Sequence, residues 1–285
     1  MRLILLIAAT LVGVASTVAE LNAAPAAPEP IAIAGYGGEA MEPFVSRDGR
    51  VLFFNTRNDP GADTNIHFAT TTGTGFTYRG MLSGTVSNDL DAVPTMSAGG
   101  RFCFISPRAY RATLVSVFCG AFDGTKVAKV EPQRGLAAAR LGRLIFDVEL
   151  STDGNTMLFA EGTFSGGAVP DEADIYIATL TPKGFRRSPE SARILAAVNT
   201  GALEFAPALA ADGRELWFTR ITGIWPFKSP TIFRATRTSI DQPFGKPEHV
   251  DAIEGFVEAP TFAPNGAIYF HKRSDDRYQL WRLTR

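Results

Sequence analysis

Acidic and basic side chains recur at matching places along this chain, and their types could support chemistry. Carboxylates stand shortly before five similar apolar segments, and arginines stand shortly after the apolar run that follows four of the five turns. Pairs of carboxylates hydrolyse glycosidic bonds, and carboxylate oxygens are also the hard ligands that bind cations. The candidate binding residues are the acids Glu42, Asp91, Asp147, Glu149, Glu204 and Glu258 and the arginines Arg57, Arg108, Arg220 and Arg273.

The sequence leaves several interpretations of these charged residues open. If they converge on one axis, they could form a polar pocket for a ligand or a cation. Two of the carboxylates could instead act on a glycan. Alternatively, acids and arginines of neighbouring units pair with one another and cap the channel. The acids lie at different offsets from the aligned glycines of the repeat described next, so they do not form one strict column.

The elements that must position these residues form an internal repeat. The stretch "EPFVSRDGRVLFF" is followed by "VPTMSAGGRFCFI", "DVELSTDGNTMLF", "APALAADGRELWF" and "APTFAPNGAIYF". Their aligned glycines are Gly49, Gly100, Gly154, Gly213 and Gly266, which are 51, 54, 59 and 53 residues apart. A period of about 50 residues is typical of propellers and other repeat architectures.

Each unit has the pattern of four antiparallel strands. An apolar segment of strand length leads into an Asp-Gly or Asn-Gly type of turn, where glycine supplies the positive φ that reverses the chain. A second strand follows, then a third such as "ADIYIATL", and then a weaker fourth. Four strands per unit is the composition of a propeller blade.

The number of units predicts a five-bladed β-propeller of the all-β class. Before Pro43 there is room for only one short strand, "PIAIAG" at Pro30–Gly35, and after "YQLWRLTR" no fourth strand follows. We therefore expect the N-terminal strand to complete the last blade and close the ring, which leaves no open sheet edge. In this fold the first strands line a central channel. The charged residues would then lie at one mouth, and the Asp-Gly turns on the opposite face.

The repeat resembles that of TolB-type β-propellers. The resemblance rests on the pattern Pro-x-x-Ser-x-Asp-Gly-x-x-Leu-x-Phe, a following Arg, and "DIY" at Asp174–Tyr176, and it extends from Pro30 to Arg285. The stretches "RATRTSIDQPFGKPEHV" and "FAPNGAIYFHKR" are similar to exported bacterial members. The resemblance implies a propeller in a periplasmic or secreted setting. It implies no particular reaction, because such repeats occur in binding proteins, in scaffolds and beside hydrolase domains.

The N-terminus predicts export. Arg2 precedes the short apolar run Leu3–Ala15, and small residues favour cleavage after Ala19, which is the pattern of a signal peptide; an uncleaved anchor is the alternative. The predicted organisation is a signal peptide (1–19), a flexible Pro/Ala leader (20–29) and one propeller domain (30–285). The mature chain should have no membrane span and act as a monomer. The net charge of −1 provides no general field to recruit nucleic acid or an acidic membrane.

The remaining candidate residues give weaker signals. The three histidines lie in different units without metal-ligand spacing, so we interpret them as structural and predict no metal site from them. Cys103 and Cys119 lie on neighbouring strands of one unit, so a disulfide and two buried thiols both remain open. The loop "GTFSGGAVPDEAD" (162–174) should project from the mouth face.

These features favour an exported binding or interaction protein with a polar site at the channel mouth. Its ligand would be a protein, a peptide or a glycan, and nucleic acid is not expected. The sequence indicates no cofactor, although the ring of acids would allow a bound cation. A carbohydrate-active enzyme that uses axial carboxylates is the first alternative, and a scaffold without a specific ligand is the second.

Overall fold

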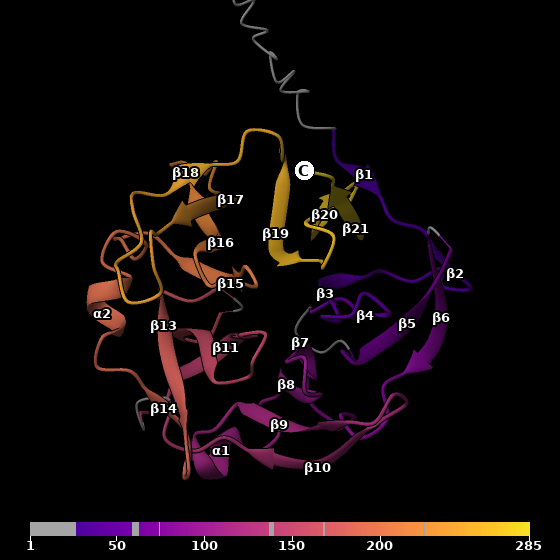
Figure 1. Ribbon diagram of the computed structural model, residues 1–285, viewed down its shortest axis with the longest axis horizontal. Coiled ribbons are helices and arrows are strands. Elements are labelled where there is room, and N and C mark those ends of the chain that lie inside the picture. Colours follow the sequence, from indigo (N-terminus) through magenta and orange to yellow (C-terminus); the bar gives the residue numbers. More distant parts are fainter. Residues whose placement is uncertain (1–26, 59–62, 74, 137–139, 168, 225) are drawn as a thin grey trace, which may run out of the picture.

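The protein is a five-bladed β-propeller (Figure 1). The computed structural model describes residues 27–58, 63–73, 75–136, 140–167, 169–224 and 226–285. The predicted signal peptide lies outside these residues, as does most of the leader. Five sheets surround one axis, and the first strand of each blade lies innermost. None of the helices in the described ranges is long and apolar enough to cross a membrane.

The blades follow one another in chain order. Blade 1 contains β2 (Ile33–Ala34), β3 (Met41–Val45), β4 (Val51–Asn55), β5 (Ile66–Thr72) and β6 (Gly75–Met81), and blade 2 contains β7 (Ala92–Met96), β8 (Arg101–Ile105), β9 (Val117–Phe122) and β10 (Val127–Pro132). Blade 3 contains β11 (Arg143–Leu150), β12 (Thr156–Thr163), β13 (Glu172–Thr181) and β14 (Gly184–Arg187). Blade 4 contains β15 (Glu204–Leu209), β16 (Glu215–Thr222), β17 (Ser229–Thr236) and β18 (Glu248–His249). Blade 5 contains β19 (Phe256–Phe262), β20 (Ile268–Ser274), β21 (Arg277–Leu283) and β1 (Glu29–Pro30). Two short helices, α1 (Tyr110–Thr113) and α2 (Ser191–Ile194), lie in connecting loops.

The N-terminal segment completes blade 5 and closes the ring, as predicted, and it also adds a strand to blade 1. Glu29 and Pro30 pair antiparallel with β21 and complete blade 5. The chain continues to Ile33 and Ala34, which pair parallel with β6 and give blade 1 a fifth strand. The short segment therefore joins the last blade to the first through the hydrogen bonds of two sheets.

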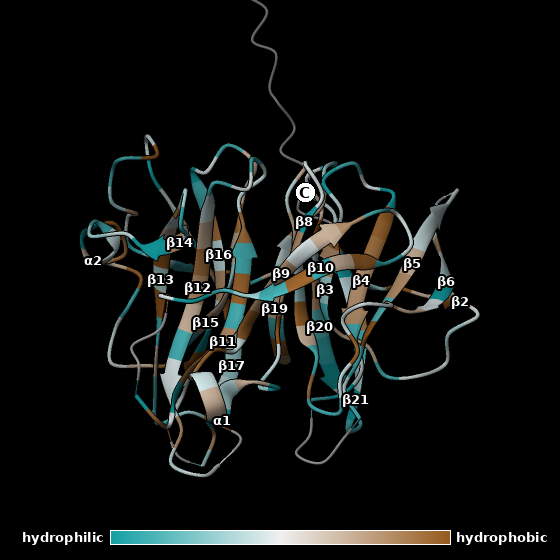
Figure 2. Ribbon diagram, turned by 90° about the horizontal axis from the view of Figure 1, so that it is seen from below, coloured by the Kyte–Doolittle hydropathy of each residue, from teal (hydrophilic) through white to brown (hydrophobic). Residues whose placement is uncertain are grey.

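The chain alternates between two faces of the disc, and we name these faces by their loops. The turns at Gly49, Gly100, Gly154, Gly213 and Gly266 lie on what we call the turn face. The loops between second and third strands lie on the opposite face, which we call the loop face, and the connections between successive blades end there. Figure 2 shows the disc from its side, with α1 at the lower, loop face and the C-terminus at the upper, turn face.

The Ser-x-Asp-Gly turns are held by their own side chains. Ser46 Oγ donates to Asp48 Oδ1 at 2.6 Å and accepts from the N–H of Val51 at 2.9 Å. Ser151 and Asp153 repeat this arrangement in blade 3. The polar residues of these turns therefore serve to reverse the chain.

Every inner strand carries a β-bulge, where its pairing with the second strand shifts register. The bulge spans the repeated Pro in four blades, whereas in blade 3 it lies at Phe146, two residues before Val148. In four blades the residue before Pro has a positive φ of 49° to 56°: Glu42, Val93, Ala206 and Ala259. Pro lacks an N–H, so the bulge leaves no donor unpaired at that position. Blade 3, whose Pro is replaced by Val148, lacks the positive φ at the matching Asp147.

Apolar side chains pack between adjacent blades, and a disulfide joins two strands within blade 2. Phe53 and Phe54 are fully buried on opposite sides of their blade, in separate core clusters. Cys103 on β8 pairs in register with Cys119 on β9, and the two sulfurs form a disulfide. The cross-link lies in the core cluster between blades 2 and 3.

Replacing both cysteines (C103A/C119A) should lower the free energy of unfolding by about 3 kcal/mol, because the disulfide closes a loop of 16 residues. Urea denaturation of the oxidised wild type and the double variant measures this difference. Equal stabilities would show that the cross-link does not constrain the unfolded chain.

Candidate functional site

The bulges direct backbone N–H groups of one blade toward side chains of the preceding blade. Val93 N–H donates to Glu42 Oε2 and Asn55 Oδ1, both at 3.1 Å, and Ala206 N–H donates to Asp147 Oδ2 at 3.1 Å. The same contact joins blade 4 to blade 5 and blade 5 to blade 1, through Ala259 N–H to Thr219 Oγ1 (3.2 Å) and Glu42 N–H to His271 Nδ1 (3.1 Å). At four of the five junctions between blades, therefore, a backbone N–H at a bulge donates to a side chain of the preceding blade.

The junction between blades 2 and 3 is different. Ser116 Oγ donates to the carbonyl of Ile145 at 2.5 Å, and Leu150 N–H donates to Thr95 Oγ1 at 2.9 Å. This is the junction that leads into the blade without the Pro bulge. The missing Pro in the third repeat therefore marks a real change in how two blades meet.

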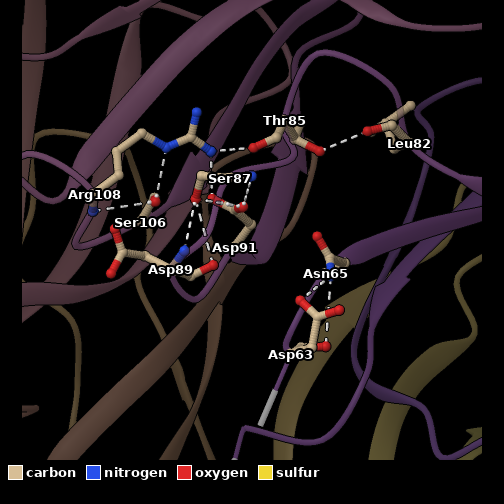
Figure 3. A network of polar contacts seen from close by, with 9 residues as sticks. All are labelled: Asp63, Asn65, Leu82, Thr85, Ser87, Asp89, Asp91, Ser106 and Arg108. Carbon is tan, nitrogen blue, oxygen red and sulfur yellow. Dashed lines mark hydrogen bonds and ion pairs between the residues drawn. The ribbon is translucent and has the colours of Figure 1, made fainter. Parts of the chain in front are cut away.

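Two of the predicted acids, Asp91 and Glu204, form their charged contacts within their own blades. Asp91 is fully buried, forms an ion pair with Arg108, and accepts from the N–H and hydroxyl of Ser87 (Figure 3). Glu204 is equally buried and accepts from Arg220 Nε at 2.7 Å and Thr200 Oγ1 at 2.6 Å. Both carboxylates fix the loop that enters the first strand.

The cognate arginines also stack on aromatic rings of the second and third strands. Arg108 lies over Phe104 and Phe118, and Arg220 lies 4.7 Å from the ring centroid of Phe233. These four charged residues were predicted to point toward one mouth of the channel. The structure instead pairs them acid to arginine inside blades 2 and 4, where they stabilise the loop-face end of each blade.

Blade 3 also contains a buried carboxylate paired with an arginine that stacks on an aromatic ring. The sequence pattern did not identify the residues that form it. Glu161 is buried, with Arg143 Nε at 2.9 Å and Arg187 Nη2 at 2.8 Å from its Oε2. Arg187 also lies 3.9 Å from the ring centroid of Tyr176. Because this acid ends the second strand instead of preceding the first, alignment on the turn glycine could not find it.

The two remaining arginines lie at the seam of blades 5 and 1 on the loop face. Arg57 contacts Glu39 at 3.5 Å and donates to the carbonyl of Asp276 at 2.9 Å. Arg273 is exposed, and its guanidinium carbon lies 4.0 Å from the ring centroid of Phe256 and 6.0 Å from that of Tyr278.

Three predicted acids interact electrostatically at the axis. Asp147 of blade 3 is buried, whereas Glu42 of blade 1 and Glu258 of blade 5 are partly buried, and the Glu258 side chain is 18% exposed. Burial raises the pKa of Glu42 to about 7; the charge of Glu258 raises it too, while His271 and the Val93 N–H oppose the shift. Burial, followed by the charge of Glu42, raises the pKa of Asp147 well above its ordinary range.

His271 connects Glu42 of blade 1 to Glu258 of blade 5. It is 1% exposed, and its Nδ1 accepts from the Glu42 N–H. A neutral ring that accepts at Nδ1 carries its proton on Nε2, and Nε2 lies 3.0 Å from Glu258 Oε2. His271 was interpreted from the sequence as a structural histidine. The structure places it between two partly exposed axial acids, Glu42 and Glu258.

Glu149 closes the turn-face end of the channel. Its Oε1 accepts from Arg47 of blade 1 at 2.8 Å, and its Oε2 accepts from Thr95 of blade 2 at 2.9 Å. The backbone N–H of Leu209 in blade 4 also bonds to it and favours its charged form, although burial, the largest effect, raises its pKa. One carboxylate thus joins four blades. The sequence placed Glu149 at the mouth, whereas it lies at the other end, held by a residue of the Asp-Gly turn.

Little space remains along the axis. The cavity there has a volume of about 30 Å³ and is lined by residues that include Glu42, Asp147, Glu149 and Thr261. This is room for a few waters and is far below the ~300 Å³ of small-ligand pockets. In the described part of the chain, no group of three or more His, Cys, Asp or Glu side chains has the geometry to hold a metal ion.

Comparison with known proteins supports the fold and goes no further. No family model matches the chain, and no curated protein sequence matches it. Solved structures do match: a glycoside hydrolase (13% identity, TM-score 0.64, 91% of each chain), the catalytic domain of an α-L-arabinofuranosidase from Coprinopsis cinerea (12%, 0.53, 90% of this chain and 95% of that one), and a protein from Agrobacterium tumefaciens assigned to TolB (13%, 0.51, 89% and 78%). TolB proteins and glycoside hydrolases are both similar in fold, at identities too low to transfer a function.

The raised pKa of Glu42 should make the stability of the protein depend on pH. Its folded pKa of about 7 lies above its ordinary value of 4.5, so the folded state binds the proton more tightly. The resulting stabilisation is complete below pH 4.5 and is lost as the pH rises to 7, by about 3 kcal/mol at most. Glu42→Gln should remove this contribution and flatten the unfolding free energy measured from pH 4.5 to 8. Identical slopes in both proteins would contradict the assignment.

Removing Arg47 should leave the Glu149 carboxylate buried without its cation. Arg47→Ala should therefore lower the free energy of unfolding by about 3–5 kcal/mol, and R47A/E149Q should recover part of the loss. The neighbouring Arg50, whose side chain is 84% exposed, provides the matched control. R50A should change stability by less than about 0.5 kcal/mol. Similar losses from R47A and R50A would show that the cross-channel contact is not what matters.

Proposed function

We propose that this propeller is a binding module that takes its ligand on the loop face, at the rim of the channel instead of inside it. The observation that carries the proposal is the closure of the axis. Asp147 is buried, Glu42 and Asp147 both accept backbone N–H groups, and Arg47 and Glu149 fill the turn-face end. The remaining axial cavity of about 30 Å³ is too small for a glycan or a peptide, so such a ligand would bind at the outer edge of the mouth.

The accessible groups at that edge come from blade 5. Glu258 reaches the surface, and its charge helps to raise the pKa of Tyr278, after the larger effect of burial. Arg273 is exposed against Phe256 and Tyr278, unlike Arg108 and Arg220, which are bonded to buried carboxylates. An aromatic surface with one donor cation and one acceptor carboxylate suits a polar ligand with hydroxyl or amide groups, such as a glycan or a peptide.

The second candidate is hydrolysis of a glycan, and one observation favours it. Glu42 is an acid whose pKa is raised to about 7, and it interacts with Asp147 and Glu258 on the axis. A carboxyl group with a raised pKa beside an ionised one is the arrangement that glycosidases use. The small axial cavity and the burial of Asp147 count against substrate access.

A panel of neutral and acidic oligosaccharides and short peptides distinguishes the two candidates, with calorimetric titration for binding and release of reducing ends for turnover. A binding module should bind without turnover, and R273Q or E258Q should weaken binding about tenfold or more through loss of a charged hydrogen bond. R50Q, on the turn face, is the matched control and should bind as the wild type does.

Turnover by the wild type that is lost in E258Q or E42Q would overturn the binding module and support the enzyme. Glu204, which the sequence also offered as a candidate site residue, is unsuitable for this test because its loss would leave Arg220 without its carboxylate partner. Absence of binding to every probe, with a folded protein, would leave the scaffold alternative. Export to the periplasm or beyond stays a prediction from the N-terminal sequence.

A further inference from the structure

Large apolar side chains are exposed mainly on one face of the propeller. Seven such residues are exposed in the described part of the chain, and six belong to the loop face: Met81, Val86, Leu141, Val169, Ile224 and Phe227. Ile240, between β17 and β18, lies on the turn face. Scattered exposed apolar residues are ordinary, but their concentration on one face of a monomer indicates an interaction surface.

The four most exposed of the six lie on three loops of two neighbouring blades. Leu141 lies in the loop that enters blade 3, Val169 in the loop between β12 and β13, and Ile224 and Phe227 in the loop between β16 and β17. Their side chains are 66% to 80% exposed. We call this set the apolar loop tips.

The loops that carry the tips are connected to one another by backbone contacts. Phe164 N–H donates to the carbonyl of Gly142 at 2.8 Å, which joins the loops of Leu141 and Val169. Leu203 bridges to Ala173 at the start of β13, and its carbonyl accepts from Ile221 N–H beside the third loop. The tips therefore stand over one contiguous part of the loop face.

Basic residues flank the apolar loop tips. Arg140 and Lys228 are exposed directly beside Leu141 and Phe227, and Arg134 and Arg111 are exposed in the same loop and in the neighbouring loop of blade 2. The acids near the tips are Asp171, which accepts from Ser165 Oγ at 2.5 Å, and Glu172, which is paired with Arg143 at 2.8 Å. The net charge of −1 gives the molecule no overall attraction to anions, but the three loops hold three exposed cations, Arg134, Arg140 and Lys228, against one exposed acid, Asp171.

We propose that the apolar loop tips insert into the surface of a lipid bilayer that contains anionic headgroups. Separate apolar tips on neighbouring loops can enter the acyl boundary independently, and flanking cations contact the headgroups. Charge complementarity favours this occupant over an apolar protein surface. The site is distinct from the rim of blade 5, so the proposal does not rest on the proposed ligand site.

Co-sedimentation with vesicles tests the proposal, with equal parts of phosphatidylglycerol and phosphatidylcholine compared with phosphatidylcholine alone. All variants keep the same N-terminus, so the apolar run Leu3–Ala15 contributes equally. I224S/F227S should lower the partition coefficient for the anionic vesicles at least about tenfold, because two large apolar side chains no longer leave water. I240S, similarly exposed but on the turn face, should bind as the wild type does.

A second variant tests how much the flanking cations contribute to vesicle binding. R140S/K228S should reduce the preference for anionic vesicles and its sensitivity to salt, while retaining the apolar contribution. Thermal unfolding of every variant should match the wild type, since all of these side chains are exposed.

Three results would overturn the proposal. The wild type could fail to sediment with anionic vesicles, or I224S/F227S could bind as tightly as the wild type, or I240S could lose binding equally. Light scattering that shows a wild-type dimer and an I224S/F227S monomer would assign the tips to self-association instead of lipid.

Discussion

Each inner strand of this propeller contains a bulge, and in four of the five blades one N–H there leaves its own sheet and faces the preceding blade. A buried N–H without an acceptor costs as much as a lost hydrogen bond, so the preceding blade must supply an acceptor. Asn55, Glu42, Asp147, Thr219 and His271 supply it. The blades are thereby held in register around the axis by polar contacts that accompany the apolar packing between their faces.

This constraint explains why carboxylates gather on the axis. Glu42 and Asp147 accept N–H groups, and Glu149 collects donors from three other blades at the far end of the channel. Burial of several acids together raises the pKa values of Glu42 and Asp147, which resembles the electrostatics of an active site. Here the same shifts follow from packing acids where the ring needs acceptors. A raised pKa on the axis is therefore weak support for catalysis.

The side chains that a ligand or partner could contact therefore lie mainly on the loop face. The blade 5 rim offers a cation, a carboxylate and aromatic rings, and the loops of blades 3 and 4 offer apolar side chains flanked by cations. The two surfaces differ in kind because they come from different blades. A closed ring of five similar units holds both rigidly, while each loop remains free to differ in length and composition.

The sequence by itself determined the fold, because five recurrences of a strand–turn–strand pattern admit few arrangements and the short N-terminal strand fits only a closed ring. It also determined the turns, where Ser46 and Asp48 act locally. Only the tertiary structure decided which acid meets which base. Asp91 and Glu204 turned out to bond within their blades, and Glu149 to bond Arg47 across the channel. Such contacts depend on side-chain direction at a bulge and on the distance between blades, and neither is encoded in the spacing of residues along the chain.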